Sequence, residues 1–231
     1  MGMMGAACSD PCASAPTPDT GDTVPTDWTP AALSDDIPVA SAAPGQLGPH
    51  DLAIWRSASG RIAAWADRCP HRGMRLSHGF VRGERLSCIY HGWGYGEGGQ
   101  CVRIPAHPEL TPPEAIRVPV FSVAEASGVI WVAEEAPDSP PPEFPGVAAF
   151  RSLQVLAAPE ALAAALGGTG TVIETVLGGA QVVALIQPLR GDSAGLHLLA
   201  PEGSDPAALD ALSAEVEALR RRLEAAEEMT A

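Results

Sequence analysis

Lysine is absent from this chain of 231 residues, and all 14 of its basic side chains are arginines. Aspartate and glutamate together number 28, so the formal net charge is −14 at pH 7. Nucleic acid binding depends on many basic side chains that contact phosphates, so this balance excludes nucleic acid as a partner of the whole molecule. A phosphate-binding loop that ends in lysine is excluded as well.

Long apolar runs are also absent, and no segment reaches the roughly 20 residues that a membrane-spanning helix needs. Residues 1–24 are rich in small residues and proline and are predicted to form a disordered tail. Residues 5–8 faintly resemble a lipoprotein cleavage site, but the basic start and apolar stretch of a secretion signal are missing. We therefore expect a cytoplasmic protein with no membrane partner.

Cysteine is scarce, with five residues in the whole chain. Cys8 and Cys12 lie in the predicted tail and are interpreted as free thiols, and Cys101 is interpreted as a small buried apolar residue of a strand. The other two cysteines each lie shortly before a histidine, in the segments Cys69–His71 and Cys88–His91.

Each of these two segments offers one thiolate and one imidazole. Two cysteines and two histidines can hold a tetrahedral zinc ion, or a [2Fe–2S] cluster in which two histidines replace two cysteines on one iron. Gly73, Gly92 and the glycine-rich stretch 94–99 favour the cluster. Glycine lets the backbone approach a ligand closely, and bridging sulfides accept hydrogen bonds from backbone N–H groups.

Three segments together resemble the Rieske domain of Rieske non-haem iron oxygenases: Cys69–Gly73, Cys88–Trp93 and Gly99–Pro105. The resemblance assigns residues 25–136 to this domain and implies a [2Fe–2S] cluster as the cofactor. It also implies that Cys69 and Cys88 hold the inner iron, and that His71 and His91 hold the outer iron near the surface. The extra disulfide-forming cysteines of respiratory-chain Rieske proteins are missing, which indicates the oxygenase type.

The same resemblance implies which residues surround the cluster: Arg72, Gly73, Met74, Tyr90, Gly92, Trp93 and Tyr95. Tyr95 stands where the family often has a tyrosine that reaches a ligand cysteine sulfur. High-potential members have a hydroxyl donor at the position of Trp93. The resemblance therefore implies a midpoint potential near the low end of the Rieske range, about −150 mV.

The predicted fold class is α+β and mainly β. A small antiparallel Rieske sandwich or barrel would form the first of the two structural units along the chain. Its ligand-bearing segments would lie on loops at one tip. Residues 57–60 predict a hairpin turn. Branched and aromatic residues between turn signals predict strands at residues 37–40, 52–56, 61–65, 85–89, 102–104, 116–123 and 129–132.

A Pro-rich linker is predicted at residues 137–150, followed by a small α+β unit at 151–231. This unit would be a small β-sheet followed by a C-terminal amphipathic helix, and its order of elements faintly resembles the end of an oxygenase catalytic domain. The segment Ser204-Asp205-Pro206 opens the helix, with a capping side chain followed by proline in the first turn. Its apolar residues either pack on the sheet or form an oligomerising coil. The elements predicted here are strands at 153–157, 171–177, 181–188 and 195–200, a short helix at 159–166, and an apolar stripe of Leu209, Leu212, Val216, Leu219 and Leu223.

A pair of histidines at helical spacing is missing. The resemblance implies that an oxygenase would hold a mononuclear iron by two such histidines and one carboxylate. Beyond the cluster ligands the chain has His50, His78, His107 and His197, and none of them forms such a pair. The segment that would carry this iron is predicted to be absent, and the second unit is interpreted as a shrunken remnant of a catalytic domain.

The leading hypothesis is an electron-transfer or auxiliary subunit. It would take electrons from a ferredoxin or flavin reductase and pass them to a separate full-length Rieske oxygenase subunit in a hetero-oligomer. Residues 50–120 carry nine arginines and six acids, which are read either as scattered charges or as a docking patch for an acidic partner. The stripe on the C-terminal helix is expected to be covered by a partner as well. The alternatives are a ring-hydroxylating or demethylating oxygenase subunit with an unrecognised iron site, and a structural or regulatory subunit.

Overall fold

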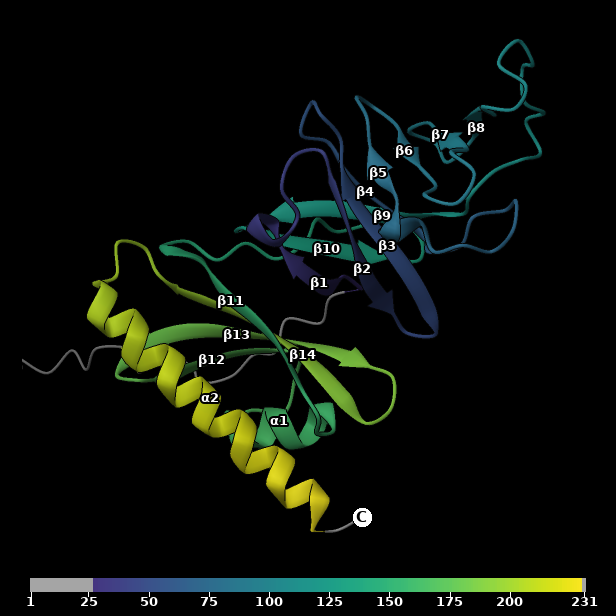
Figure 1. Ribbon diagram of the computed structural model, residues 1–231. Helices are drawn as coiled ribbons and strands as arrows, with labels where there is room; N and C mark the ends of the chain where they lie inside the picture. Colours follow the sequence, from purple (N-terminus) through teal and green to yellow (C-terminus); the bar gives the residue numbers. More distant parts are fainter. Residues whose placement is uncertain (1–26, 230–231) are drawn as a thin grey trace, which may run out of the picture.

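The computed structural model describes residues 27–229, so the predicted tail with Cys8 and Cys12 lies outside the described residues. Within 27–229 the chain forms fourteen strands in three sheets, two α-helices and two short 3₁₀ helices, η1 (Ser34–Asp36) and η2 (Leu76–His78) (Figure 1). Every strand pair is antiparallel. The predicted α+β class with a strand majority is confirmed.

The first sheet has six strands in the order β1-β10-β9-β4-β3-β2. These are β1 (Thr29–Leu33), β2 (Ser41–Leu47), β3 (His50–Arg56), β4 (Ile62–Ala66), β9 (Val120–Ala126) and β10 (Val129–Ala133). The predicted turn at 57–60 joins β3 to β4. Both faces of β3 are covered, which explains its nearly continuous apolar sequence. Leu52 and Ile54 belong to one core, whereas Ala53 and Trp55 belong to another.

The core that contains Ala53 and Trp55 lies under a small four-stranded sheet, which carries the ligand segment Cys88–His91. Its strands have two or three residues each, in the order β5 (Phe80–Val81), β6 (Leu86–Ser87), β7 (Gly94–Tyr95) and β8 (Cys101–Arg103). Such short strands are held by the core beneath them rather than by their own pairing. That core contains both cysteines of the predicted site, Cys69 and Cys88.

The third sheet has the order β11-β14-β13-β12. Its strands are β11 (Val147–Val155), β12 (Val172–Leu177), β13 (Ala180–Leu189) and β14 (Ser193–Pro201), and its helices are α1 (Pro159–Ala165) and α2 (Pro206–Glu228). Both helices cover one face of this sheet (Figure 1). Pro206 begins α2, and the carboxylate of Asp205 accepts a hydrogen bond from the Ala207 N–H at 2.8 Å.

The apolar stripe of α2 packs against the third sheet. Leu212, Val216 and Leu219 are buried there, and Leu209 and Leu223 pack against the same core at its margin. The interpretation as a helix that lies on the sheet is therefore confirmed. The expectation that a partner covers this stripe is wrong, because the sheet already buries it.

The other face of the third sheet packs on the first sheet. Trp28, Trp131, Val183, Leu185 and Leu199 share one core across this contact. The Pro-rich stretch also lies against the first sheet. The Trp28 Nε1–H donates to the Ser139 carbonyl at 2.8 Å, and the Phe144 N–H donates to the Ser127 hydroxyl at 2.7 Å. β11 begins at Val147, inside the stretch predicted as a linker.

Two predictions for the N-terminal strands differ from the structure. Residues 37–40 form a turn instead of a strand, because Pro38 and the positive φ of Ala40 (61°) bend the chain, and Val39 is exposed. β1 was not predicted, because Pro30 weakens its strand signal. The structure tolerates this proline because β1 is an edge strand with an irregular register at Pro30.

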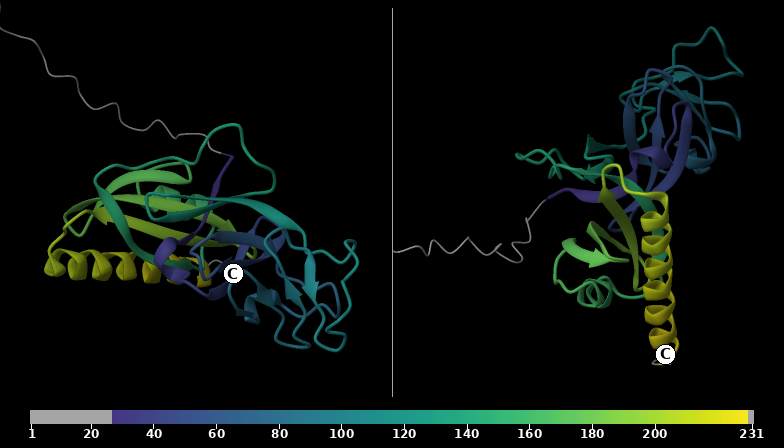
Figure 2. Two further views of the ribbon diagram at one scale, coloured as in Figure 1. Left: turned by 90° about the horizontal axis from the view of Figure 1, so that it is seen from above. Right: turned by 90° about the vertical axis from the view of Figure 1, so that its left-hand side faces the viewer.

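The small sheet of β5–β8 and the C-terminal end of α2 lie at opposite ends of the molecule (Figure 1; Figure 2, right view). Among residues 27–229, no helix is long and apolar enough to cross a membrane.

Candidate metal centre

The first ligand loop leaves β4 and runs to η2. It closes on itself through two backbone hydrogen bonds, from the Cys69 N–H to the Met74 carbonyl and from the Gly73 N–H to the Cys69 carbonyl, both 2.8 Å. Gly73 has a φ of +74°, a left-handed conformation that favours glycine. The loop therefore holds Cys69 at its base, and His71 lies at its tip.

The second loop joins β6 to β7 and has the same closure. The Cys88 N–H donates to the Trp93 carbonyl at 2.9 Å, and the Gly92 N–H donates to the Cys88 carbonyl at 3.0 Å. Gly92 has a φ of +69°, and a side chain there would lie 3.0 Å from Pro105. The motif glycines thus make two turns of the same shape, and Pro105 supports the second turn from outside.

The two cysteines are buried and lie close together. Cys69 is 3% exposed and Cys88 is 2% exposed. Burial, followed by the neighbouring charge of Cys69, raises the pKa of the Cys88 thiol. Two thiolates in this place would repel each other strongly unless a bound cation offset their charge. The Cys69 Sγ also lies 3.0 Å from the Tyr95 hydroxyl, as the resemblance implied for Tyr95.

The two histidines lie at the surface next to each other. The ring centroids of His71 and His91 are 4.7 Å apart, and His91 is exposed while His71 is half-buried. The Trp93 ring stacks on His71 at 4.3 Å with the planes 4° apart, a contact that the sequence did not predict. Burial, and then the positive charges of His91 and Arg72, lower the pKa of His71, which favours the neutral imidazole that binds metals.

These residues fit a [2Fe–2S] cluster. The thiols and the imidazoles form two adjacent pairs, one buried and one at the surface, as expected when each pair serves a different iron. A tetrahedral zinc ion would instead have to contact all four side chains at once. The separation into a buried thiol pair and a surface imidazole pair therefore favours the cluster over the tetrahedral zinc alternative.

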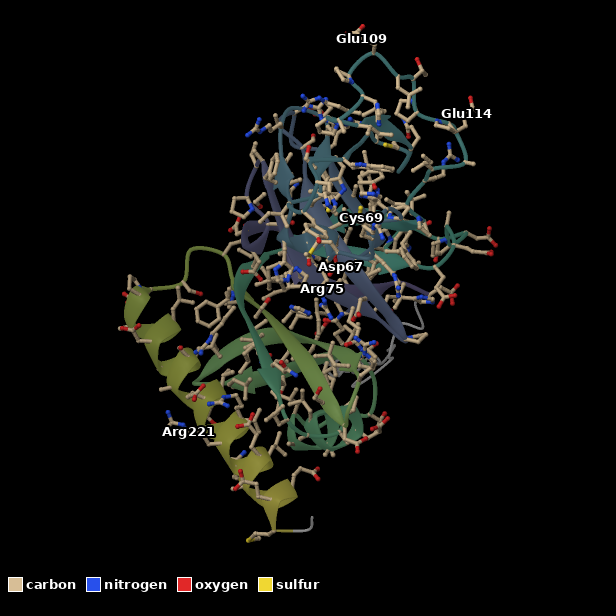
Figure 3. The ribbon with its side chains drawn as sticks, turned by 45° about the vertical axis from the view of Figure 1, so that its right-hand side comes forward. Asp67, Cys69, Arg75, Glu109, Glu114 and Arg221 are labelled. Carbon is tan, nitrogen blue, oxygen red and sulfur yellow. The ribbon has the colours of Figure 1, made fainter. Side chains whose placement is uncertain are left out.

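A network of charges supports the base of the first loop and was not predicted. The buried Asp67 carboxylate accepts hydrogen bonds from the Ser77 N–H at 2.7 Å and the Ser77 hydroxyl at 2.6 Å. Arg75 lies 3.7 Å from Asp67 and 3.5 Å from Asp51, and Asp51 also pairs with Arg190 of the β13–β14 turn. Asp67 and Arg75 lie next to Cys69 in Figure 3. Sequence spacing gives no sign of this network, because its residues are far apart in the chain.

The predicted arginine patch is smaller than its residue count suggests. Arg56 pairs with Glu125 at 2.7 Å, and Arg61 pairs with Glu84 and Glu97. Within residues 27–229, no acidic partner within ion-pair distance is found for five exposed arginines of this region: Arg68, Arg72, Arg82, Arg103 and Arg117. Figure 3 shows Glu109 and Glu114 on the outer loop beyond β8, which adds negative charge at the far end.

Cys101 and two of the other histidines, His50 and His197, have contacts outside the cluster site. Cys101 is buried in β8, as predicted. His50 pairs with Glu134 at 3.2 Å. His197 is buried in the third sheet, and its Nδ1 lies 2.8 Å from the Ser152 hydroxyl.

Comparison with known proteins agrees with this geometry. Residues 27–122 match the protein family described as Rieske [2Fe–2S] domain. The oxidoreductase NdmD of Pseudomonas putida is 44% identical over 115 residues, which cover 49% of this chain and 20% of that protein. The oxygenase subunit of 3-chlorobenzoate-3,4-dioxygenase of Comamonas testosteroni is 38% identical over 109 residues, covering 46% and 25%. The chain therefore spans about a fifth to a quarter of these relatives' length.

The fold likeness extends further than the sequence likeness. The crystal structure of dicamba monooxygenase bound to dicamba matches with a TM-score of 0.71 and 20% identity, covering 87% of this chain and 86% of that chain. At this identity the match shows the fold alone, but its extent includes the second unit as well as the ligand loops. Residues 27–122 therefore form a Rieske [2Fe–2S] domain, and through it the chain is a relative of the Rieske oxygenase components.

Proposed function

We propose that the chain is an electron-transfer or auxiliary subunit of a Rieske oxygenase system. Cys69 and Cys88 hold the buried iron, and His71 and His91 hold the iron at the surface. When bound, a [2Fe–2S] cluster supplies one-electron redox chemistry. The observation that carries the proposal is the asymmetry of this site, in which both thiols are buried and both imidazoles reach the surface. An electron can therefore cross at the histidine edges to a partner that docks there.

The loop tips have the character of a docking face. Ile89 is 57% exposed and Tyr90 is 59% exposed, directly before the exposed His91. Arg72 is exposed beside His71. Adjacent apolar and positive side chains favour a partner with an acidic surface that also has apolar groups. A ferredoxin or a flavin reductase as donor, and a full-length Rieske oxygenase subunit as acceptor, fit this proposal.

The histidine content of the second unit supports the assignment of oxygen activation to another subunit. His197 is the single histidine between residue 108 and the end of the chain, whereas the oxygenase iron needs two histidines and a carboxylate. Its ring nitrogens lie 2.8 Å from the Ser152 hydroxyl and 3.4 Å from the Gln187 side-chain oxygen, inside the sheet. We therefore assign oxygen chemistry to a partner subunit.

A second candidate function is an oxygenase that hydroxylates rings or demethylates its substrate at an iron site of its own. The sequence similarity to the oxygenase subunit of 3-chlorobenzoate-3,4-dioxygenase favours it. Iron analysis separates the two candidates. A cluster alone gives two irons per chain, whereas an additional mononuclear site gives three. The two candidates also differ in single-turnover reactions of the reduced chain with oxygen and a panel of aromatic and amine substrates. The electron-transfer proposal predicts no product, whereas the oxygenase candidate predicts a hydroxylated or demethylated product.

The docking face can be tested by the rate of electron entry. A reduced plant-type ferredoxin is mixed with the oxidised protein in a stopped-flow instrument, and bleaching of the visible absorption is followed. Ile89→Gln removes an exposed apolar side chain and should lower the second-order rate constant by about fivefold. Val176→Gln makes the same change on β12, where Val176 is 55% exposed, and should leave the rate unchanged.

Both variants must keep the wild-type iron content and midpoint potential, so that a rate change reports docking. An unchanged rate for Ile89→Gln at two ionic strengths would overturn the assignment of this face. Product formation that depends on a third, chelatable iron would overturn the leading proposal in favour of the oxygenase candidate.

A further inference from the structure

The two histidines of the proposed cluster site lack the hydrogen bond that usually orients a ligand ring. Among residues 27–229, no protein group forms a hydrogen bond with a ring nitrogen of His71 or His91. A histidine that binds a metal normally donates its second ring N–H to a carboxylate or carbonyl, and that bond fixes the ring. Rotation of an imidazole about its Cβ–Cγ bond is otherwise broad, so the backbone alone does not fix it. Another contact must therefore orient these rings.

Trp93 supplies such a contact to His71. The two ring centroids are 4.3 Å apart and the ring planes differ by 4°, so the indole lies face to face with the imidazole. Rotation of the His71 ring about its Cβ–Cγ bond would push one edge of the imidazole into the indole face. The stack therefore restricts the rotation that a hydrogen bond would otherwise prevent.

Trp93 is itself held in place from two sides. Its carbonyl accepts a hydrogen bond from the Cys88 N–H at 2.9 Å. Its side chain is half-buried and packs against the core that contains Cys69 and Cys88. The indole is therefore a fixed wall for His71 and not a surface ring that moves with it.

His91 has no equivalent wall. The Tyr90 ring lies 3.9 Å from the His91 ring but is tilted by 34°. Tyr90 is 59% exposed and does not belong to the core beneath the loops. His91 is exposed as well, whereas His71 is half-buried. The two imidazoles thus differ in how firmly the protein holds them.

We propose that Trp93 is a positioning residue of the cluster site: its indole face fixes the orientation of His71, so that His71 is the firmly held ligand and His91 the loosely held one. This inference rests on the proposed function, because it assumes that both histidines are cluster ligands. An imidazole that turns away from the metal releases it. Removal of the stack should therefore loosen one of the two histidines and speed the loss of iron.

The test uses the full chain loaded with its cluster and two measurements. Pulsed electron paramagnetic resonance of the reduced protein resolves the couplings of the two ligand nitrogens, and absorption follows the transfer of iron to a ferrous iron chelator. Trp93→Met removes the flat ring but keeps an apolar side chain. It should change the coupling of one nitrogen, leave the other unchanged and speed iron transfer by about tenfold, the low end of the effect of losing a contact that orients a metal ligand.

Three further variants separate the stack from the bulk of the side chain. Trp93→Phe keeps a flat ring and should retain the wild-type couplings and rate, whereas Trp93→Leu is a second ring-free variant and should behave like Trp93→Met. None of these variants introduces a hydroxyl donor next to the cluster. Tyr90→Met makes the same kind of change beside His91, and it should stay close to the wild type because the core does not hold Tyr90. Far-ultraviolet circular dichroism must match the wild type for every variant that is compared.

Wild-type couplings and iron transfer in both ring-free variants at Trp93 would overturn the proposal. Equal acceleration in Trp93→Phe and Trp93→Met would overturn it too, because the flat ring would then not matter. An effect of Tyr90→Met as large as that of Trp93→Met would overturn the difference between the two histidines. A cluster that assembles in Trp93→Phe but in neither ring-free variant would support the proposal. A wild-type chain that holds no [2Fe–2S] cluster would refute the proposed function instead, whereas the other outcomes leave the electron-transfer proposal intact.

Discussion

Replacement of Tyr95 by phenylalanine tests how this fold sets the potential of its cluster. The Tyr95 hydroxyl lies 3.0 Å from the Cys69 sulfur, and the side chain is fully buried. Burial, followed by the bond to Cys69, raises the pKa of Tyr95, so the hydroxyl remains protonated and donates to the thiolate. Reduction adds negative charge near this sulfur and strengthens the bond. Loss of the donor should therefore destabilise the reduced state and lower the midpoint potential.

The size of this shift follows from the strength of a hydrogen bond to a charged group, about 1.5–3 kcal/mol. If about half of that strength differs between the two redox states, the shift is about 30–60 mV, because 59 mV corresponds to 1.4 kcal/mol for one electron. The wild type should titrate at about −150 mV, since Trp93 supplies no hydroxyl donor.

Protein-film voltammetry of wild type and Tyr95→Phe measures the shift. The chain has two tyrosines, and Tyr90 is 59% exposed, so Tyr90→Phe makes the same chemical change without touching the buried sulfur. That control should stay within about 10 mV of the wild type, well below the shift expected from one bond. A Tyr95→Phe potential equal to or above the wild-type value would refute the reasoning, and a shift of equal size in both variants would show that it does not come from the Cys69 bond.

Two further predictions concern the metal and the fold. Cys88→Ser should purify without the reddish-brown colour of the wild type and with little iron, because a hydroxyl is a poor ligand in place of a soft thiolate. Visible absorption and iron analysis measure this loss. A colourless wild type with one zinc per chain would contradict the cluster. Burial lowers the pKa of His197 from 6.5 to about 4. Between these pH values the unfolded chain binds a proton that the folded chain does not. The free energy of unfolding should therefore fall by about 2–3 kcal/mol as the pH decreases through this window. Urea unfolding at pH 7.5 and 4.5 should show a smaller loss for His197→Gln than for the wild type, and an equal loss would disprove this role of His197.

The parts of the structure that the sequence predicted are those determined by neighbouring residues. The turn at 57–60 and the strands on either side of it follow from local turn signals and branched residues. The start of α2 follows from Asp205 and Pro206, and its packing on the third sheet is one of the two alternatives that its apolar spacing allowed. The closure of the two ligand loops follows from their motif glycines, which both have positive φ.

The parts that were missed depend on residues distant in the chain. β1 is held by pairing with β10 about a hundred residues later, and this pairing compensates for Pro30. The stack of the Trp93 ring on His71 joins two loops, so no local pattern predicts it. The sequence position of Trp93, directly after His91 and Gly92, indicates only that this position has no hydroxyl donor to the cluster. The prediction of a partner surface on α2 was wrong because the element that covers this helix is distant in the chain. Spacing reveals an apolar face but not the element that covers it.

The second unit also bears on how the cluster end is held. Arg190, in the turn between β13 and β14, pairs with Asp51, and the Asp51 backbone carbonyl accepts the Asp67 N–H at 2.9 Å. The Asp51 carboxylate in turn pairs with Arg75, which flanks the first ligand loop together with Asp67.

The second unit thus contacts the base of that loop and leaves its tip uncovered, with the helices on the far face of the third sheet (Figures 1 and 2). A loop fixed at its base reorganises little when the charge at its tip changes, and an uncovered tip remains available to a partner. Both conditions agree with the proposed transfer of electrons to another molecule.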